Sequence, residues 1–268
     1  IVRNKDLEKI VERTDEWMEK HQFDPIQVCE ELLSYFEGGS KKQLFQYLKW
    51  FGLYHSINHG EQLYKKLIQD DVWKKVKKLY QFYKKKWNGP SIPIFIFPYQ
   101  KANTFMRTHN KSGLAFPDKL LLFLSADLGN DDVEALFIHE YHHVCRLQKQ
   151  KKEETESTVA DTIILEGLAE YTVRTIMGEE NLAPWIKKYS NTFLESFWTT
   201  KFKDQLSVQK KDRLHDSVIY GRGSFPTMVG YCLGYHIVEF YFQTYPFSEK
   251  TSFSISSEEI IDHYDQKN

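Results

Sequence analysis

The stretch EALFIHEYHHVCRL, residues 134–147, holds three histidines and a glutamate within five consecutive positions. His139 and His143 are four residues apart, so on a helix their rings emerge on one face, one turn apart, and can reach a single Zn2+. A helix face exposed to solvent could have the same residues without binding a metal. However, the alanine, leucine, phenylalanine, isoleucine and valine around the histidines predict a largely buried helix. Because buried histidines and glutamates need polar partners or a metal, we interpret the stretch as a metal-binding helix.

The order His139, Glu140, His143 is the H-E-x-x-H pattern of zinc peptidases. In that pattern the glutamate does not bind the metal. It takes a proton from the attacking water and passes it to the leaving amine. Glu140 is therefore the predicted general base. His142 points elsewhere on a helix, and we expect it at the surface or in support of a ligand.

A catalytic zinc usually has three protein ligands, so a third must lie elsewhere in the chain. The metzincin pattern would need glycine at 146 and histidine at 149, where this chain has Arg146 and Lys149. The other common third ligand is a glutamate from the next helix. DTIILEGLAEY supplies Glu166 within an apolar helix, where an unpaired carboxylate is costly.

Glu170 follows Glu166 by one helical turn and is placed to accept the outer N–H of a ligand histidine, which would fix its tautomer. The interval from His143 to Glu166 is longer than in thermolysin-type peptidases. Glu170 and Asp161 therefore remain alternatives for the third ligand.

The composition limits the classes of partner. The chain has 268 residues, 41% of them hydrophobic, with a formal net charge of −1, so we expect no nucleic-acid partner. Lysines between residues 74 and 86 alternate with apolar residues at helical spacing, which is typical of a solvated helix face. No apolar run is long enough to span a membrane, and the first residues lack the apolar core of a signal sequence. Three widely spaced cysteines favour a reduced, cytoplasmic protein.

The pattern along the chain predicts three regions: residues 1–88 helical, residues 89–178 a catalytic core, and residues 179–268 helical and closing the cleft. Apolar stretches at 92–97, 114–116 and 120–125 read as short strands that precede the motif helix. Thr158 or Ser157 can cap a helix that runs to about Met177, with Gly178 behind it.

The motifs HEYHHVCRL, LEGLAEY and GYCLGYHIVEFY, with RTDEW near the N-terminus, resemble the YjaZ-like zinc-dependent proteases, of glutamate-zincin type. This resemblance covers most of the chain. It implies an α+β, zincin-like fold, mostly helical, with a small mixed sheet beside the H-E-x-x-H active-site helix. It also supports Zn2+ as the cofactor.

Hydrolysis of an amide also needs a donor to the developing oxyanion. The downstream candidates are Tyr220, Arg222, Tyr231, Tyr235 and His236. We favour Tyr231 and then Tyr235, although tyrosines packed in a core would give the same pattern. An edge strand at residues 112–116 is the expected place for an extended substrate.

The sequence thus predicts a zinc metallopeptidase with His139, His143 and Glu166 as ligands, a peptide or protein substrate, and a monomeric state. A zinc hydrolase of a non-peptide amide would share the same site. A non-catalytic, zinc-stapled peptide-binding protein would need a fourth protein ligand, for which His142 or Glu170 is nearest.

Overall fold

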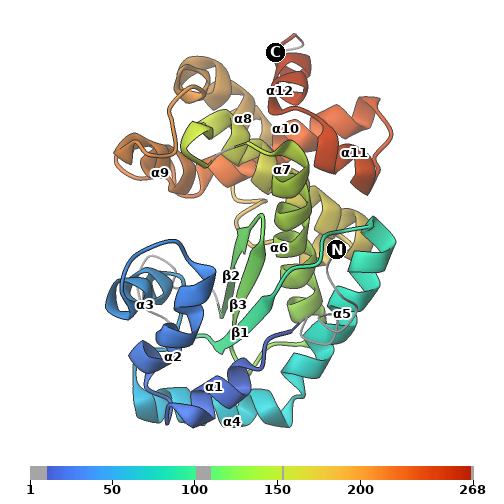
Figure 1. Ribbon diagram of the computed structural model, residues 1–268. Helices are drawn as coiled ribbons and strands as arrows, with labels where there is room; N and C mark the ends of the chain where they lie inside the picture. Colours follow the sequence, from blue (N-terminus) through green and yellow to red (C-terminus); the bar gives the residue numbers. More distant parts are fainter. Residues whose placement is uncertain (1–10, 101–109, 153, 267–268) are drawn as a thin grey trace. The chain divides into compact units, whose positions relative to one another are not determined.

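The computed structural model describes residues 11–100, 110–152 and 154–266 (Figure 1). The chain forms two compact units, residues 1–144 and 145–268, and the boundary between them falls within helix α6 (Asn130–Gln150). The architecture is α+β, mostly helical with a small mixed sheet, as the sequence predicts. The division into three functional regions stays a prediction.

The first unit begins with helices whose ends follow from local sequence signals. The Asp24 side chain accepts hydrogen bonds from the backbone N–H groups of Ile26 and Gln27, and Pro25 occupies the first helical position. Ser40 forms a capping box with Gln43 at the next helix. The helices are α1 (Thr14–Lys20), α2 (Pro25–Leu32), α3 (Lys41–Trp50), α4 (Ile57–Gln69) and α5 (Val72–Trp87).

Within the described residues, the sheet has three strands in the order β1-β3-β2: β1 (Ile94–Pro98), β2 (Lys111–Phe116) and β3 (Lys119–Leu124). β1 pairs with β3 in parallel, and β2 pairs with β3 antiparallel. The three predicted strands are confirmed. Because β3 is central, β2 lies at one edge of this sheet, where the sequence places an edge strand.

The two faces of the sheet contact different helices. Phe95, Phe97, Leu121 and Phe123 point into a core shared with residues of α1 to α4. Gly113 of β2 pairs with Leu122 and contacts Glu140 of α6. Since side chains alternate along a strand, α6 lies against the opposite face from α1 to α4.

An aromatic layer fixes α6 against α5. Tyr141 of α6 stacks on Trp87 at 5.7 Å between ring centroids and contacts Tyr80 edge-on at 5.4 Å. The hydroxyls of Tyr80 and Tyr141 both donate to the carbonyl of Pro90, at 3.1 and 3.0 Å. The lysines of α5 are exposed or half-buried, and Lys84 and Lys86 lie over the rings of Tyr80 and Tyr83 at 5.8 and 5.9 Å. The buried face of α5 orients the motif helix.

The second unit consists of helices. Thr158 caps α7 through its bond to the Asp161 N–H, and Gly178 ends that helix with φ +98°. The helices are α7 (Val159–Met177), α8 (Asn191–Phe197), α9 (Arg213–Tyr220), α10 (Val229–Thr244), α11 (Glu249–Ser254) and α12 (Ser257–Asp265).

α7 and α10 cross at two glycines. A Cβ at Gly167 would lie 2.2 Å from the Gly234 carbonyl oxygen, and one at Gly234 would lie 2.0 Å from the Ile163 oxygen. Any larger residue would push the backbones apart. The close approach that Gly167 permits is thus made with α10, which carries Tyr231 and Tyr235.

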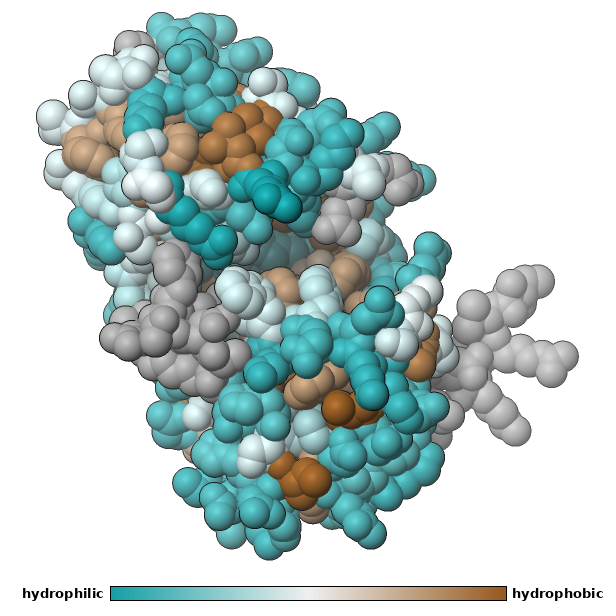
Figure 2. All heavy atoms as spheres, turned by 90° about the vertical axis from the view of Figure 1, so that its left-hand side faces the viewer, coloured by the Kyte–Doolittle hydropathy of each residue, from teal (hydrophilic) through white to brown (hydrophobic). Residues whose placement is uncertain are grey.

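The surface seen in Figure 2 is mostly hydrophilic, and the hydrophobic side chains on this face form separate small patches. Among the helices of the described ranges, none has both the length and the apolar character needed to cross a membrane.

Candidate metal centre

The two motif histidines lie together on α6. The ring centroids of His139 and His143 are 4.5 Å apart and the ring planes are nearly perpendicular. His143 is buried and His139 is half-buried. The i, i+4 spacing on an unbroken helix thus brings two imidazoles to one place, as expected from the sequence.

Glu140 is buried beside them, with 8% of its surface exposed, and its side chain contacts Gly113 of the edge strand. Sequence reasoning missed Gly113. A glycine inside a predicted strand is a signal for the close approach of another group, and that signal could have found it.

His142 is completely buried and meets the Trp87 ring edge-on, with the centroids 6.5 Å apart. Of the two places expected for His142, the helix surface is therefore wrong, and support of a ligand stays a prediction. The aromatic layer between α5 and α6 covers this face of the helix.

His139, His143 and Glu166 form a group that could hold a metal ion. One ligand atom from each lies within 4.8 Å of the others. Two imidazole nitrogens and one carboxylate oxygen are a donor set that suits Zn2+ and leaves a fourth position for water or substrate. The residues present therefore fit the metal that the motif predicts.

The two alternative third ligands have other partners. The Asp161 carboxylate accepts hydrogen bonds from the Thr158 N–H at 2.9 Å and from Lys152 Nζ at 2.7 Å, which completes the cap of α7. Glu170 is buried, and its Oε2 accepts the backbone N–H of Ala183 at 3.1 Å. This hydrogen bond from Ala183 connects the segment after α7 to this helix.

Tyr220 and Tyr231, from α9 and α10, form a pair in the second unit. Their ring centroids are 5.9 Å apart, and their side chains share a hydrogen bond. Burial and then the negative charge of Glu166 raise the pKa of Tyr220 to about 12, against the opposing effect of the Tyr231 hydrogen bond. Tyr220 therefore keeps its proton at neutral pH and can donate it in a hydrogen bond.

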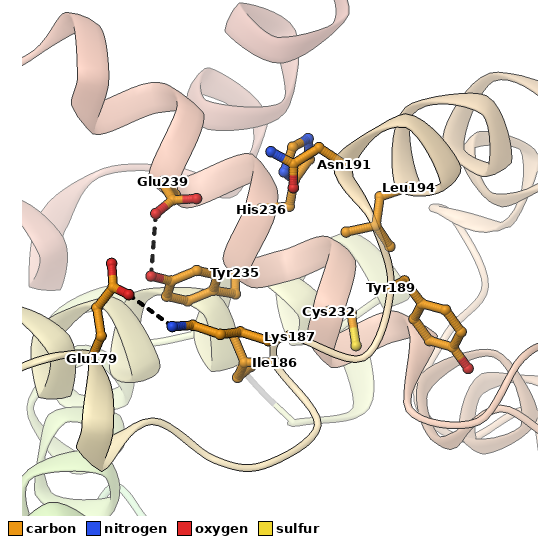
Figure 3. Close-up of a pocket in the computed structure, with 10 residues that line it drawn as sticks. All are labelled: Glu179, Ile186, Lys187, Tyr189, Asn191, Leu194, Cys232, Tyr235, His236 and Glu239. Carbon is orange, nitrogen blue, oxygen red and sulfur yellow. Dashed lines mark hydrogen bonds and ion pairs between the residues drawn. The ribbon is translucent and has the colours of Figure 1, made fainter.

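The other downstream candidates lie in different surroundings. The Arg222 guanidinium is 6.0 Å from the centre of the Tyr220 ring. Tyr235 and His236 line a cavity of about 250 Å³ in the second unit (Figure 3). There the Tyr235 hydroxyl donates to Glu239 at 3.3 Å, and burial of this side chain raises its pKa well above the usual range. Tyr231 and Tyr235 thus have different partners.

Arg146, the position that excludes the metzincin pattern, has a structural role. It is 3% exposed, and its Nη1 donates to the carbonyls of Ser252 and Ile255 at 2.7 and 2.8 Å. Burial lowers the pKa of this guanidinium to about 10, so it stays charged at neutral pH. The last turn of α6 is thereby fixed to α11 and the residue after it.

Comparison with known proteins shows the family to which the chain belongs. A family described as "Predicted Zn-dependent protease (DUF2268)" matches residues 72–262, which include the motif helix and Glu166. The chain is 36% identical to "Uncharacterized protein YjaZ" of Bacillus subtilis (strain 168) over 258 residues, covering 94% of this chain and 98% of that protein. It is 26% identical to "Uncharacterized protein YjfC" of the same organism over 116 residues, covering 40% of this chain and 38% of that protein. No solved structure matches the chain. The chain therefore belongs to the DUF2268 family of predicted Zn-dependent proteases.

Proposed function

We propose that this protein is a zinc metallopeptidase, in which Glu140 is the general base for hydrolysis of a peptide bond. The observation that supports it most directly is the group of His139, His143 and Glu166 next to a buried Glu140. A helix that only faces solvent would not bury Glu140 and His143.

His139, His143 and Glu166 would hold the zinc. Bound zinc would lower the pKa of a coordinated water to about 7 and polarise the carbonyl to be attacked. We assign to Glu170 the orientation of a ligand histidine, in addition to its bond with Ala183.

Glu140 takes the proton from the attacking water and then delivers it to the nitrogen of the leaving amine. Its burial removes competing bulk water from the carboxylate, and its place on α6 beside both histidines keeps it within reach of the reacting atoms. Glutamine at this position would keep the shape but could not accept a proton.

The donor to the developing oxyanion is Tyr231, acting together with Tyr220, and Tyr235 is the second choice. Support comes from the hydrogen bond between the two tyrosines and from the charge of Glu166, a proposed ligand in the same unit, which raises the pKa of Tyr220. A preorganised hydroxyl at such a position typically contributes about 10²–10³-fold in rate.

The substrate would lie extended along β2, the edge strand that contacts Glu140 through Gly113. Backbone hydrogen bonds to a strand edge recognise a peptide with little regard to its side chains. A peptide or protein segment is therefore a better match than a compact small amide. Cys29, Cys145 and Cys232 are buried and form no disulfide, which supports our assignment of the protein to the cytoplasm, where we expect it to act as a monomer.

The test is hydrolysis of a mixed peptide library by the purified full chain, with the cut sites read by mass spectrometry. Three samples accompany it: a chelated one, Glu140→Gln, and the matched control Asp131→Asn, an exposed carboxylate on the same helix. We expect cleavage only by the wild type and Asp131→Asn. Full cleavage by Glu140→Gln would overturn the mechanism. Bound zinc without cleavage of any peptide would instead favour a non-peptide amide or a structural metal.

A further inference from the structure

The edge strand β2 passes very close to the proposed general base. A Cβ built on Gly113 would lie 2.4 Å from both Cγ and Cδ of Glu140 and 2.7 Å from its Oε1. Contacts below 3.0 Å are essentially never seen for a real Cβ. With any side chain at position 113, either β2 or the Glu140 side chain would have to move.

β2 is held on both sides. It pairs with β3 along its whole length, from Lys111 to Phe116. Lys111 Nζ donates to the carbonyl and to Oδ1 of Asp132 at the start of α6, both at 2.8 Å. On the other face, the Ser112 hydroxyl donates to the carbonyl of Phe51. Displacing β2 would break these bonds together.

The backbone of α6 is equally fixed. Tyr83 donates to Glu134 at 2.6 Å, one side of Tyr141 stacks on Trp87, and its hydroxyl is bonded to Pro90. The side chain of Glu140 is the flexible member of the contact. A methyl group at position 113 would therefore be accommodated by a change in the first side-chain torsion of Glu140, which moves its Cγ and its carboxylate together.

We propose that Gly113 is a positioning residue for Glu140: the missing side chain lets the carboxylate lie across the backbone of the edge strand, where the general base must stand. The catalytic role of Gly113 rests on the proposed function, whereas its close approach to the Glu140 side chain does not. A misplacement of about 1 Å in an active site can cost about 10²-fold in rate.

The first experiment measures the position of Glu140 and needs no activity. Crystal structures of wild type and Gly113→Ala are compared, and the melting temperatures show that both fold. We expect an unchanged β2 with the Glu140 carboxylate displaced by about 1 Å or more, as the contact distances require. A Glu140 carboxylate left in place, with β2 shifted instead, would overturn the proposal.

The second experiment removes the atoms in conflict. Gly113→Ala should lower kcat by about 10²-fold with unchanged zinc content and little change in KM. Its effect on the melting temperature should be smaller in the Glu140→Ala background, which lacks the Cγ, Cδ and Oε1 that the new methyl group meets, than in wild type. Equal losses of melting temperature in both backgrounds would overturn the proposal.

Gly129→Ala is the matched control, because a Cβ there would meet only Asp132 Oδ2 at an ordinary 3.5 Å. It should keep wild-type kcat and melting temperature. If wild type cleaves peptides and Gly113→Ala is equally fast, the inference fails and the proposed function stands. If wild type cleaves nothing but Glu140 moves in the crystal of Gly113→Ala, the steric relation stands and the proposed function fails.

Discussion

Tyr231 of α10 hydrogen-bonds to Tyr220 of α9, and the pair lies close enough to Glu166 for its charge to raise the pKa of Tyr220. The two tyrosines come from helices joined by the segment 221–228, and Gly230 lets these helices meet, because a Cβ there would lie 2.8 Å from the Ile219 Cα. This relation separates Tyr231 from Tyr235, whose hydroxyl is bonded to Glu239.

Replacing Tyr231 by phenylalanine should lower kcat by about 10²–10³-fold with KM little changed, because a hydroxyl that donates only to the oxyanion acts only in the transition state. Tyr220→Phe should lower kcat less, since it acts through its partner. Steady-state kinetics on one cleaved peptide measures both. A larger loss for Tyr235→Phe than for Tyr231→Phe would transfer the role to Tyr235.

Metal content should separate the ligands from the general base. We expect His143→Ala to lose stoichiometric zinc and activity together, and Glu140→Gln to retain zinc while losing about 10²–10⁴-fold in kcat. Elemental analysis of dialysed protein gives the zinc content. Glu166→Gln decides the third ligand, with Asp161→Asn as its comparison. If Asp161→Asn loses the metal and Glu166→Gln keeps it, the ligand assignment is wrong.

Arg146→Met should destabilise the fold by about 2–3 kcal/mol, because it leaves the carbonyls of Ser252 and Ile255 without their charged donor in a buried place. Unfolding in guanidinium chloride measures this loss. Arg13→Met, at an exposed position with its ion pairs on the surface, is the control and should change stability by less than about 1 kcal/mol. Equal stabilities of the two variants would contradict the structural role of Arg146.

His236 should make stability depend on pH. Burial lowers its pKa below the ordinary histidine value of 6.5, against the opposing charges of Glu195 and Glu239. Between the folded-state pKa and 6.5 the unfolded chain binds more protons, so the free energy of unfolding rises with pH there. The stabilisation is complete above 6.5 and is lost as the pH falls through this range.

Denaturant unfolding of wild type and His236→Gln between pH 5 and pH 8 tests this sign. Relative to the variant, wild type should lose stability on acidification below about pH 6.5. Parallel curves for the two proteins would show that the imidazole titrates with the same pKa in both states.

The local structure was largely predictable from the sequence. The cap at Thr158, the stop at Gly178 and the spacing of His139 and His143 depend only on neighbouring residues and on the period of a helix. The three strands were predictable for the same reason, since a short apolar run bounded by turn residues is a local signal for a strand. A pair of metal ligands at i, i+4 spacing can therefore be predicted from the sequence alone.

The tertiary structure decided which residues from other elements contact these helices and strands. The contact of Gly113 with Glu140, the bond of Tyr231 with Tyr220, and the use of Arg146 to hold the end of α6 join residues that are distant in sequence or on different helices. A single sequence contains no period that relates them, because their proximity results from strand order and helix packing. The burial of His142 against Trp87, which excludes the surface position as one of its two expected places, has the same cause, because helix α5 covers this face of α6.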